Sequence, residues 1–306
     1  MDFSALMVKM VIFTVLLITG YLASRKGFLS RDFAKSASWL LVNVFLVASI
    51  MNSVLSGRPD LPVRDLWFAL VLLSLFMAGL YAIGTVCARL DPDRENAPQT
   101  LILMSAVNTL FIGLPVVQTL CGSEAVFYMG LSCIPFNLIL YSYGVWYLKK
   151  GKGGEGGVNW KDILSPAFAA SVLALLLFVL DIPMPRVVTE LFSTVSSATI
   201  PISMIVIGAT LGSVSLKDAF TKKKMYILAV VRLLLTPVLF CLLLRPFVHN
   251  QVLLITLAVI AGCPCGVVST PLSIQYGYDP TYSSEAVMVT TAFSMVTIPA
   301  LLYVLF

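Results

Sequence analysis

The sequence predicts an all-α integral membrane protein whose ten transmembrane helices form two inverted five-helix repeats, with broken, crossing helices 4 and 9. Three observations predict this fold class: the composition, the length of the apolar blocks, and matching interruptions in the two halves of the chain. Of the 306 residues, 59% are apolar and 11% are charged, and the mean hydropathy is +0.96. Soluble domains carry about 25% charged and about 45–50% apolar residues. A soluble globular protein is therefore excluded.

Ten apolar blocks have the length that a helix needs to cross a bilayer, which is about 20 residues. The first block is too long for the core of a signal peptide and lacks an A-x-A-like cleavage site, so we expect it to remain as the first helix. Short connections join the blocks, as expected for a multi-pass protein. The predicted spans are 4–24, 36–55, 66–88, 98–120, 124–147, 163–181, 190–212, 225–246, 251–275 and 284–305.

The positions of Lys and Arg predict the orientation of these spans, because cytoplasmic loops are enriched in both residues. With the N-terminus outside, fourteen of the 20 basic residues fall in inside loops and five in outside segments, while Arg232 lies within a span. Both termini are therefore predicted to be extracytoplasmic, in the plasma or inner membrane of the cell. The net charge of +5 comes from these short loops, so the lipid bilayer is the expected partner and nucleic acid is not.

A glycine-rich charged linker, KKGKGGEGGVNW, begins at Lys149 and divides the chain into halves. The predicted domains are a first five-helix repeat over 1–148, a short cytoplasmic linker over 149–161 and a second repeat over 162–306. Because five is an odd number, the second repeat must be inverted relative to the first. The tetrapeptide Ser-Glu-Ala-Val opens both the fifth and the tenth span, each time after a span interrupted by Gly and Pro.

The fourth and ninth spans contain residues that break helices at membrane depth. Pro115 cannot donate a backbone hydrogen bond and so frees the carbonyl of Phe111, and Gly113 loosens the same turn. In the ninth span Pro264 frees the carbonyl of Ile260. Such groups are tolerated within a bilayer where protein, water or a ligand meets them, and the N-termini of half-helices suit a carboxylate. Two such helices in corresponding positions favour a secondary transporter; the alternative is that both helices are only kinked.

The same residues belong to a known pattern. The segment Asn108-Thr-Leu-Phe-Ile-Gly-Leu-Pro115 resembles the N-T-L-x-x-G-x-P signature of the auxin efflux carrier family, which includes the plant PIN carriers and many bacterial permeases. Later segments, in the expected order, are similar to the seventh, ninth and tenth helices of that family: Ile200-Pro201-Ile-Ser203, Ala261-Gly-Cys-Pro264 and Thr290-Thr-Ala-Phe-Ser294. The resemblance covers essentially the whole chain.

The resemblance implies a function and a division of the helices. Helices 1, 2, 6 and 7 would form a scaffold, and helices 3–5 and 8–10 would form a transport domain in a homodimer. This domain would carry small organic anions (mono- or dicarboxylates, with auxin-like acids among the candidates) by an elevator-type movement. The short central loop fits a bacterial-type permease better than a plant auxin exporter. Carried over by position, the crossover prolines are Pro115 and Pro264, and Asn108 lies beside the anion. The other predicted substrate contacts are Thr109, Gly113, Ser132, Asn137, Gly262, Ser269 and Thr270.

Arg232 lies about eight residues into the eighth span, and an arginine at this depth is a functional candidate. It would contact either the substrate carboxylate or the carbonyls that the prolines free. The alternative is that it snorkels to the inner face of the membrane, where further lysines lie. Polar residues of the second span pose a similar choice, between lining the site and packing against other helices: Asn43, Ser49, Asn52 and Ser53.

The acidic residues limit how transport is driven. All fifteen lie in loops or at the ends of predicted spans, so no carboxylate is expected at mid-membrane to bind Na⁺ or relay protons. Uniport of the anion is the first expectation, and proton-linked movement through the substrate's own carboxyl group stays open. A sodium-coupled organic-anion symporter of the bile-acid-carrier type is the alternative, and a channel-like pore is a further one. Six dispersed cysteines and one histidine predict no metal site and no cofactor. The sequence contains no H-E-x-x-H and no G-x-S-x-G motif, so an enzyme is not expected.

Overall fold

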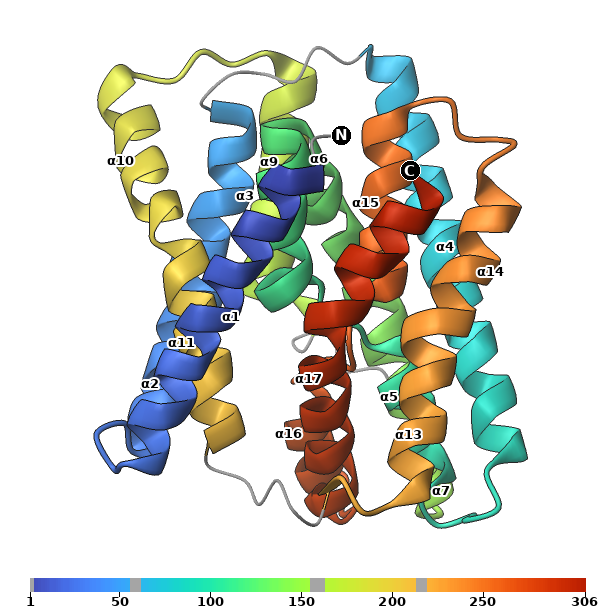
Figure 1. Cartoon of the computed structure of the whole chain (residues 1–306). Coiled ribbons are helices and arrows are strands. Elements are labelled where there is room, and N and C mark those ends of the chain that lie inside the picture. The colour runs from blue at the N-terminus through green and yellow to red at the C-terminus, as the bar shows by residue number, and fades with distance from the viewer. Residues whose placement is uncertain (1–2, 56–61, 155–162, 213–218) are drawn as a thin grey trace.

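A computed structural model describes residues 3–55, 62–154, 163–212 and 219–306, and within these ranges the chain is helical with no named β-strand (Figure 1). The start of α1 and the end of α17 lie at the same end of the molecule. Four π-helical turns continue directly into α-helices: η1 (Leu41–Phe45), η2 (Thr109–Gly113), η3 (Leu140–Gly144) and η4 (Val231–Leu235). The α-helices are α1 (Phe3–Arg25), α2 (Arg31–Leu40), α3 (Leu46–Leu55), α4 (Val63–Leu90), α5 (Ala97–Ser105), α6 (Leu114–Ile139), α7 (Val145–Gly151), α9 (Pro166–Leu180), α10 (Arg186–Ser197), α11 (Thr199–Gly212), α13 (Lys223–Val230), α14 (Thr236–Leu244), α15 (Gln251–Gly262), α16 (Ser269–Gln275) and α17 (Pro280–Leu305).

Seven helical stretches of the described residues are long and apolar enough to cross a membrane. Two further apolar helices, α9 and α15, are shorter. The prediction of a helical multi-pass membrane protein is therefore confirmed. One of the seven stretches, Thr109–Gly151, is 43 residues long and contains Gly122 at a φ of 69°, where the helix is interrupted. The predicted linker over 149–161 differs at its start, because α7 continues to Gly151, and 155–161 lie outside the described residues.

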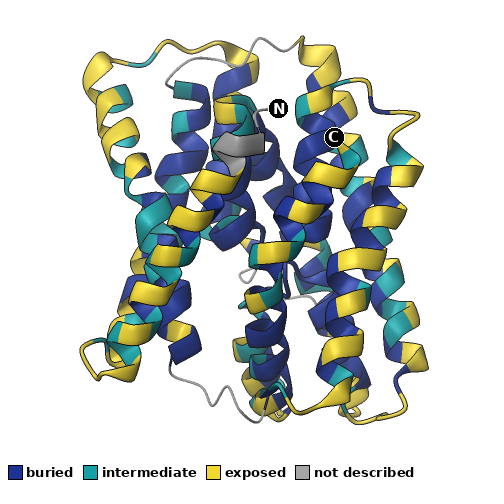
Figure 2. Cartoon of the chain, viewed as in Figure 1, coloured by how far each residue is buried: buried dark blue, intermediate teal, exposed yellow. Residues whose placement is uncertain are grey.

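Many large apolar side chains are exposed on the outer faces of the helices, as contact with lipid requires. Figure 2 shows how exposed and buried residues are distributed over the helices. On α4, Val71 and Leu75 are 58% and 66% exposed, and on α14, Leu242 and Leu243 are 64% and 56% exposed. Within lipid no hydrophobic force drives helices together, so close packing has to hold them. The exposed leucines and valines on the outside of the helices thus agree with the membrane protein that the apolar composition predicts.

One group of helices is α1, α2, α3, α9, α10 and α11, which pack against one another on one side of the molecule (Figure 1). The contact between α1 and α11 depends on glycines: a Cβ on Gly208 would lie 2.0 Å from the carbonyl oxygen of Leu17, and one on Gly20 would lie 2.2 Å from that of Ile205. Small residues that let two backbones approach are typical of membrane helix pairs. Between α3 and the α10–α11 segment, Ser49 Oγ lies 2.7 Å from Thr199 Oγ1, so this polar residue of the second predicted span serves packing.

The other group contains α4, α5, α13, α14, α15, α16 and α17, with α6 packed against helices of both groups. Ion pairs join segments of this second group at the end of the molecule where α13 begins. Lys222 Nζ lies 2.6 Å from Glu285 Oε1, and Lys224 Nζ lies 2.9 Å from Asp91 Oδ1. Glu285 is thereby held in a buried position within α17, not at its first residues as the sequence predicted.

Candidate functional site

Two interruptions, one in each half of the chain, meet inside the molecule. The first separates α5 from η2 at Ala106–Asn108, and the second separates α15 from α16 at Cys263–Val268. They are paired by an antiparallel β-bridge between Val107 and Cys265. In this bridge the Asn108 N–H donates to the Pro264 carbonyl at 3.0 Å, and the Gly266 N–H donates to the Ala106 carbonyl at 2.7 Å. Each break therefore satisfies backbone groups of the other, as membrane burial requires.

The second break lies where the sequence predicted it, at Pro264, whereas the first lies before Pro115. Pro115 stands in the first turn of α6, directly after the π turn η2, and the chain leaves the helix earlier, after Ser105. Within η2 the Gly113 N–H donates to the Asn108 carbonyl at 3.3 Å, so the wide turn accommodates the missing donor of Pro115. The position of the break is set by its pairing with the other half, which no local pattern encodes.

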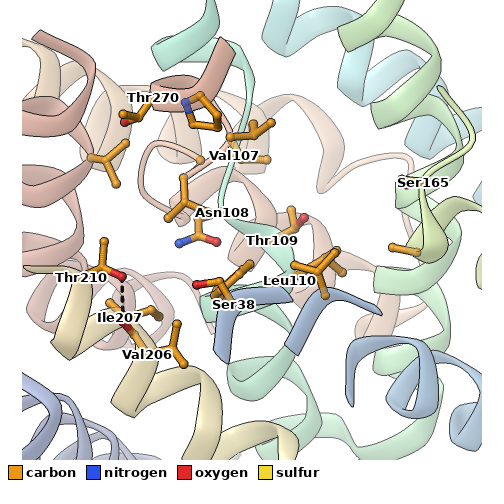
Figure 3. Close-up of a pocket in the computed structure, with 18 of the residues that line it drawn as sticks. Ser38, Val107, Asn108, Thr109, Leu110, Ser165, Val206, Ile207, Thr210 and Thr270 are labelled. Carbon is orange, nitrogen blue, oxygen red and sulfur yellow. Dashed lines mark hydrogen bonds between the residues drawn. The ribbon is translucent and has the colours of Figure 1, made fainter. Parts of the chain in front are cut away.

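A cavity of about 700 Å³ lies against both breaks, between the two groups of helices (Figure 3). The second break contributes Gly266, Val267 and Val268 to its lining. None of the described residues that line it is charged, and most of its wall is apolar. Three of the four π turns contribute to the lining, which is consistent with the frequent use of π turns at functional sites. The first break contributes Val107 and Asn108. The π turns contribute Val42 (η1), Thr109, Leu110 and Phe111 (η2), and Leu140 and Tyr141 (η3).

Asn108 is the polar centre of this wall. Its side chain is 3% exposed, lines the cavity, and its amide nitrogen Nδ2 has no hydrogen-bond partner in the described part of the chain. The next three residues, Thr109–Phe111, form the first turn of a helix, and first-turn N–H groups have no acceptor within their own helix. Asn108 thus presents a hydrogen-bond donor to an uncharged cavity beside the start of a helix, and a helix start carries a partial positive charge.

Some of the other predicted substrate contacts line the cavity, and others do not. Asn137 and Thr270 line the cavity with Asn108 and Thr109. Ser132 does not: its hydroxyl donates to the Met129 carbonyl at 2.6 Å, and the side chain is fully buried. The remaining predicted contacts, which also lie outside the lining, are Gly113, Pro115, Gly262, Pro264 and Ser269.

The two glycines among these serve close packing. A Cβ on Gly113 would lie 2.9 Å from Cys263 Sγ, and a Cβ on Gly262 would lie 3.1 Å from Leu301 Cδ2. Ser269 is 1% exposed, and its hydroxyl has no partner among the described residues. Sequence reasoning missed several polar lining residues that come from other helices: Ser38, Tyr141, Ser165, Thr210 and Ser284.

Arg232 neither snorkels nor lines the cavity. Its side chain is 0% exposed, in the π turn η4. The guanidinium Nη1 donates to the Ala261 carbonyl at 2.9 Å, and Nη2 donates to the Ile260 carbonyl at 3.3 Å. Of the alternatives that the sequence left open, contact with freed carbonyls is therefore the one that the structure shows.

Comparisons with known proteins agree with a membrane transporter. The sequence model of a family described as membrane transport protein matches residues 5–156 and 154–302, once in each half of the chain. An uncharacterized transporter of Methanocaldococcus jannaschii is 23% identical over 302 residues, which cover 93% of this chain and 94% of the relative.

Proposed function

Because the chain belongs to the membrane transport protein family, the family of the auxin efflux carriers that its motifs resemble, we propose that it is a secondary transporter that binds small organic anions at the paired breaks. The observation that carries this proposal is the unpaired Nδ2 donor of Asn108, buried in the wall of an uncharged cavity beside a helix start. A buried donor without a partner is costly, and a carboxylate oxygen is the acceptor that would satisfy it. The paired breaks are thus the anion site.

The proposed substrate is a monocarboxylate with an apolar body. Neutral amide and backbone donors can stabilise one carboxylate, but the described lining residues hold no cation to balance a second one. The facing wall consists of aliphatic and aromatic side chains, which favour an apolar body over a hydroxylated one. The residues that would contact this body include Leu110, Phe111, Phe136, Val206, Ile207 and Met288.

We further propose ten membrane crossings in two inverted repeats. The seven long stretches become eight when Thr109–Gly151 is divided at Gly122, and the shorter helices α9 and α15 bring the number to ten. The family match in each half and the pairing of one break with the other support this arrangement, with the interrupted fourth and ninth helices crossing at the β-bridge. Interrupted helices at the interface of inverted repeats are the typical binding site of secondary transporters.

Alternating access would then follow an elevator-type movement. The cavity lies between the group of α1, α2, α3, α9, α10 and α11 and the group that carries the breaks, and both groups line it. Its lining extends to Ala34 and Ser38 of α2 and to the exposed Ile274 of α16. Towards the other end, α3, α6 and α9 pack together, with the rings of Phe127 and Phe178 stacked at 5.0 Å. With both termini extracytoplasmic, this structure represents a state open to the cytoplasm.

The proposal is tested with the purified protein in detergent and in liposomes. Thermal stability is measured against monocarboxylates with aliphatic or aromatic bodies and against dicarboxylates of similar size, with Na⁺ or choline as the cation. A specific ligand at about 100 times its dissociation constant should stabilise the protein by about 2.7 kcal/mol. Asn108→Ala should reduce the shift to about half or less at the same ligand concentration, and it should weaken the saturable uptake in liposomes. Asn43→Ala, whose side chain donates to the Trp39 carbonyl away from the cavity, is the matched control.

The outcomes separate the alternatives. A shift that requires Na⁺ would favour a sodium-coupled symporter, and flux without saturation would favour a pore. If no carboxylate stabilises a folded protein, the anion assignment is wrong. The predicted homodimer and the plasma or inner membrane location remain proposals, and the mass of the purified particle measures the first of them.

A further inference from the structure

Arg232 is a charged side chain that the proposed substrate contacts do not use. It is fully buried, and in the described part of the chain no acidic side chain forms an ion pair with it. A buried charge without compensation is strongly destabilising. The groups around the guanidinium must therefore supply the compensation, and they indicate what the charge does.

The compensation comes from the end of α15. In an unbroken helix the carbonyls of Ile260 and Ala261 would accept from the N–H groups of residues 264 and 265. Pro264 has no N–H, and the Cys265 N–H donates instead to Thr290 Oγ1 at 3.2 Å. The Ile260 carbonyl accepts from the Cys263 N–H at 3.3 Å, and the two guanidinium nitrogens of Arg232 add donors to both carbonyls. The charge of Arg232 thus lies at the negative end of the 12-residue helix.

This position is the one that a coupling cation would take. In secondary transporters with interrupted helices, unwound carbonyls and the C-terminal ends of half-helices coordinate Na⁺. Here the same kinds of group are occupied by a side-chain cation that belongs to the chain. On the other side of the break, the Pro264 carbonyl accepts from the Asn108 N–H at 3.0 Å, so the charge and the proposed anion site share one short backbone segment.

We propose that Arg232 is a built-in cation at the paired breaks, which replaces a coupling ion and supplies the fixed positive charge for one carboxylate. This inference rests on the proposed function and adds its energetics. In a site of low dielectric constant a single fixed charge balances a monoanion, whereas a dianion would leave one negative charge uncompensated. Anion binding then requires no Na⁺, and the loaded site is close to neutral when it moves.

The first experiment separates the charge of Arg232 from its hydrogen bonds. Arg232→Lys keeps the charge with fewer donors, and Arg232→Gln keeps donors without the charge. Binding of the best monocarboxylate is measured for both variants in sodium chloride and in choline chloride. Arg245→Gln is the matched control, because it removes a charge from an exposed position just after α14. Wild type and the control should bind equally in both salts, Arg232→Lys within about threefold of wild type, and Arg232→Gln at least about tenfold more weakly.

The second experiment uses chemical rescue. Arg232→Ala should lose anion affinity, and free guanidinium at a low, non-denaturing concentration should restore part of it. Urea has a similar planar shape and donors but no charge, so it should restore none. If urea restores binding as well as guanidinium does, Arg232 acts only as a hydrogen-bond donor and the inference is wrong.

The remaining outcomes are also decisive. Wild-type binding that requires Na⁺, or wild-type affinity in folded Arg232→Gln, overturns the inference and leaves the anion site intact. If Arg232→Gln does not fold, Arg232→Lys decides, because a folded lysine variant that has lost anion binding contradicts a role for the charge. If the wild type binds no carboxylate in either salt, the proposed function fails, and this inference fails with it.

Discussion

The two breaks that meet inside the molecule share a backbone pairing but differ in what surrounds them. The first break presents the unpaired amide of Asn108 to the cavity. At the second break, side chains of other helices bond to the backbone: Arg232 donates to the Ala261 carbonyl, and Thr290 accepts from the Cys265 N–H. Thus one break keeps a donor free for a ligand, and the other has partners for the groups that its proline frees. Similar sequences in the two halves therefore do not imply similar chemistry at the two breaks.

The largest expected effect concerns the pairing on which both breaks depend. A Cβ on Gly266 would lie 2.9 Å from the carbonyl oxygen of Ala106, which is backbone and cannot move aside like a side chain. Gly266→Ala should push the breaks apart and destabilise the protein by about 1–3 kcal/mol, with loss of anion binding. Gly262→Ala is the control, because its Cβ would meet side chains alone, a terminal methyl of Leu301 at 3.1 Å and Ile298 Cγ1 at 3.8 Å. Equal midpoints of thermal unfolding for the two variants would contradict the prediction.

The second prediction tests whether the first break is built for a ligand at the expense of stability. Without ligand, Asn108→Ala should leave the free energy of unfolding unchanged within about 0.5 kcal/mol or raise it, because no bond of the Nδ2 donor is lost. Its affinity for the monocarboxylate should nevertheless fall at least about tenfold. Thermal unfolding with and without the anion measures both quantities. A large loss of stability without ligand would show that Asn108 is structural.

The converse should hold at the second break. Thr290→Val leaves the buried Cys265 N–H without its acceptor, which should destabilise the protein by about 1–2 kcal/mol. Anion affinity should remain within about threefold of wild type, since Thr290 does not line the cavity. Thr256→Val, which removes a hydroxyl that donates to the Val252 carbonyl within α15, is a control for loss of a buried hydroxyl. Equal stability of the two variants would remove the special role assigned to Thr290.

Several parts of this comparison could be predicted from the sequence. The breaks themselves follow from prolines in apolar blocks, and Asn108 and Arg232 stand out because polar residues at that depth are rare. Helical periodicity would also have separated Ser132 from Asn137, since five residues correspond to opposite sides of a helix. The lining of the cavity follows this period with Cys133, Phe136, Asn137 and Leu140.

Other parts could not be predicted, for physical reasons. The first break lies at Ala106–Asn108 and not at Pro115 because the partner segment supplies its hydrogen bonds, and such tertiary pairing leaves no local signal. The π turns have no recognisable sequence pattern here. Ser38 lies on α2, which packs against α11, and Thr210 lies on α11, which glycines bring close to α1. The position of such lining residues depends on how whole helices meet.

The smallest expected effect concerns the helices that follow the interrupted segments. α17 begins at a capping residue, Asp279, whose carboxylate accepts from the Thr281 N–H at 2.9 Å. In the first half the corresponding part of α6 follows Gly122, at a φ of 69°, in place of a carboxylate cap. The backbone hydrogen bond from Thr281 lowers the pKa of Asp279 below its usual value. Of these two helix starts, the one at Asp279 therefore depends on pH.

The sign of this dependence follows from the lowered pKa. Stability from the cap is present above the unfolded value of about 3.9 and is lost as the pH falls through the lower folded value. Asp279→Ala should reduce stability by about 1 kcal/mol at neutral pH, and the difference from wild type should shrink below about pH 4. Asp279→Asn retains a capping oxygen without the titration, so most of the stability should survive and its contribution should not change with pH. Thermal midpoints over this pH range decide, and an alanine variant as stable as wild type at neutral pH would show that the cap contributes nothing.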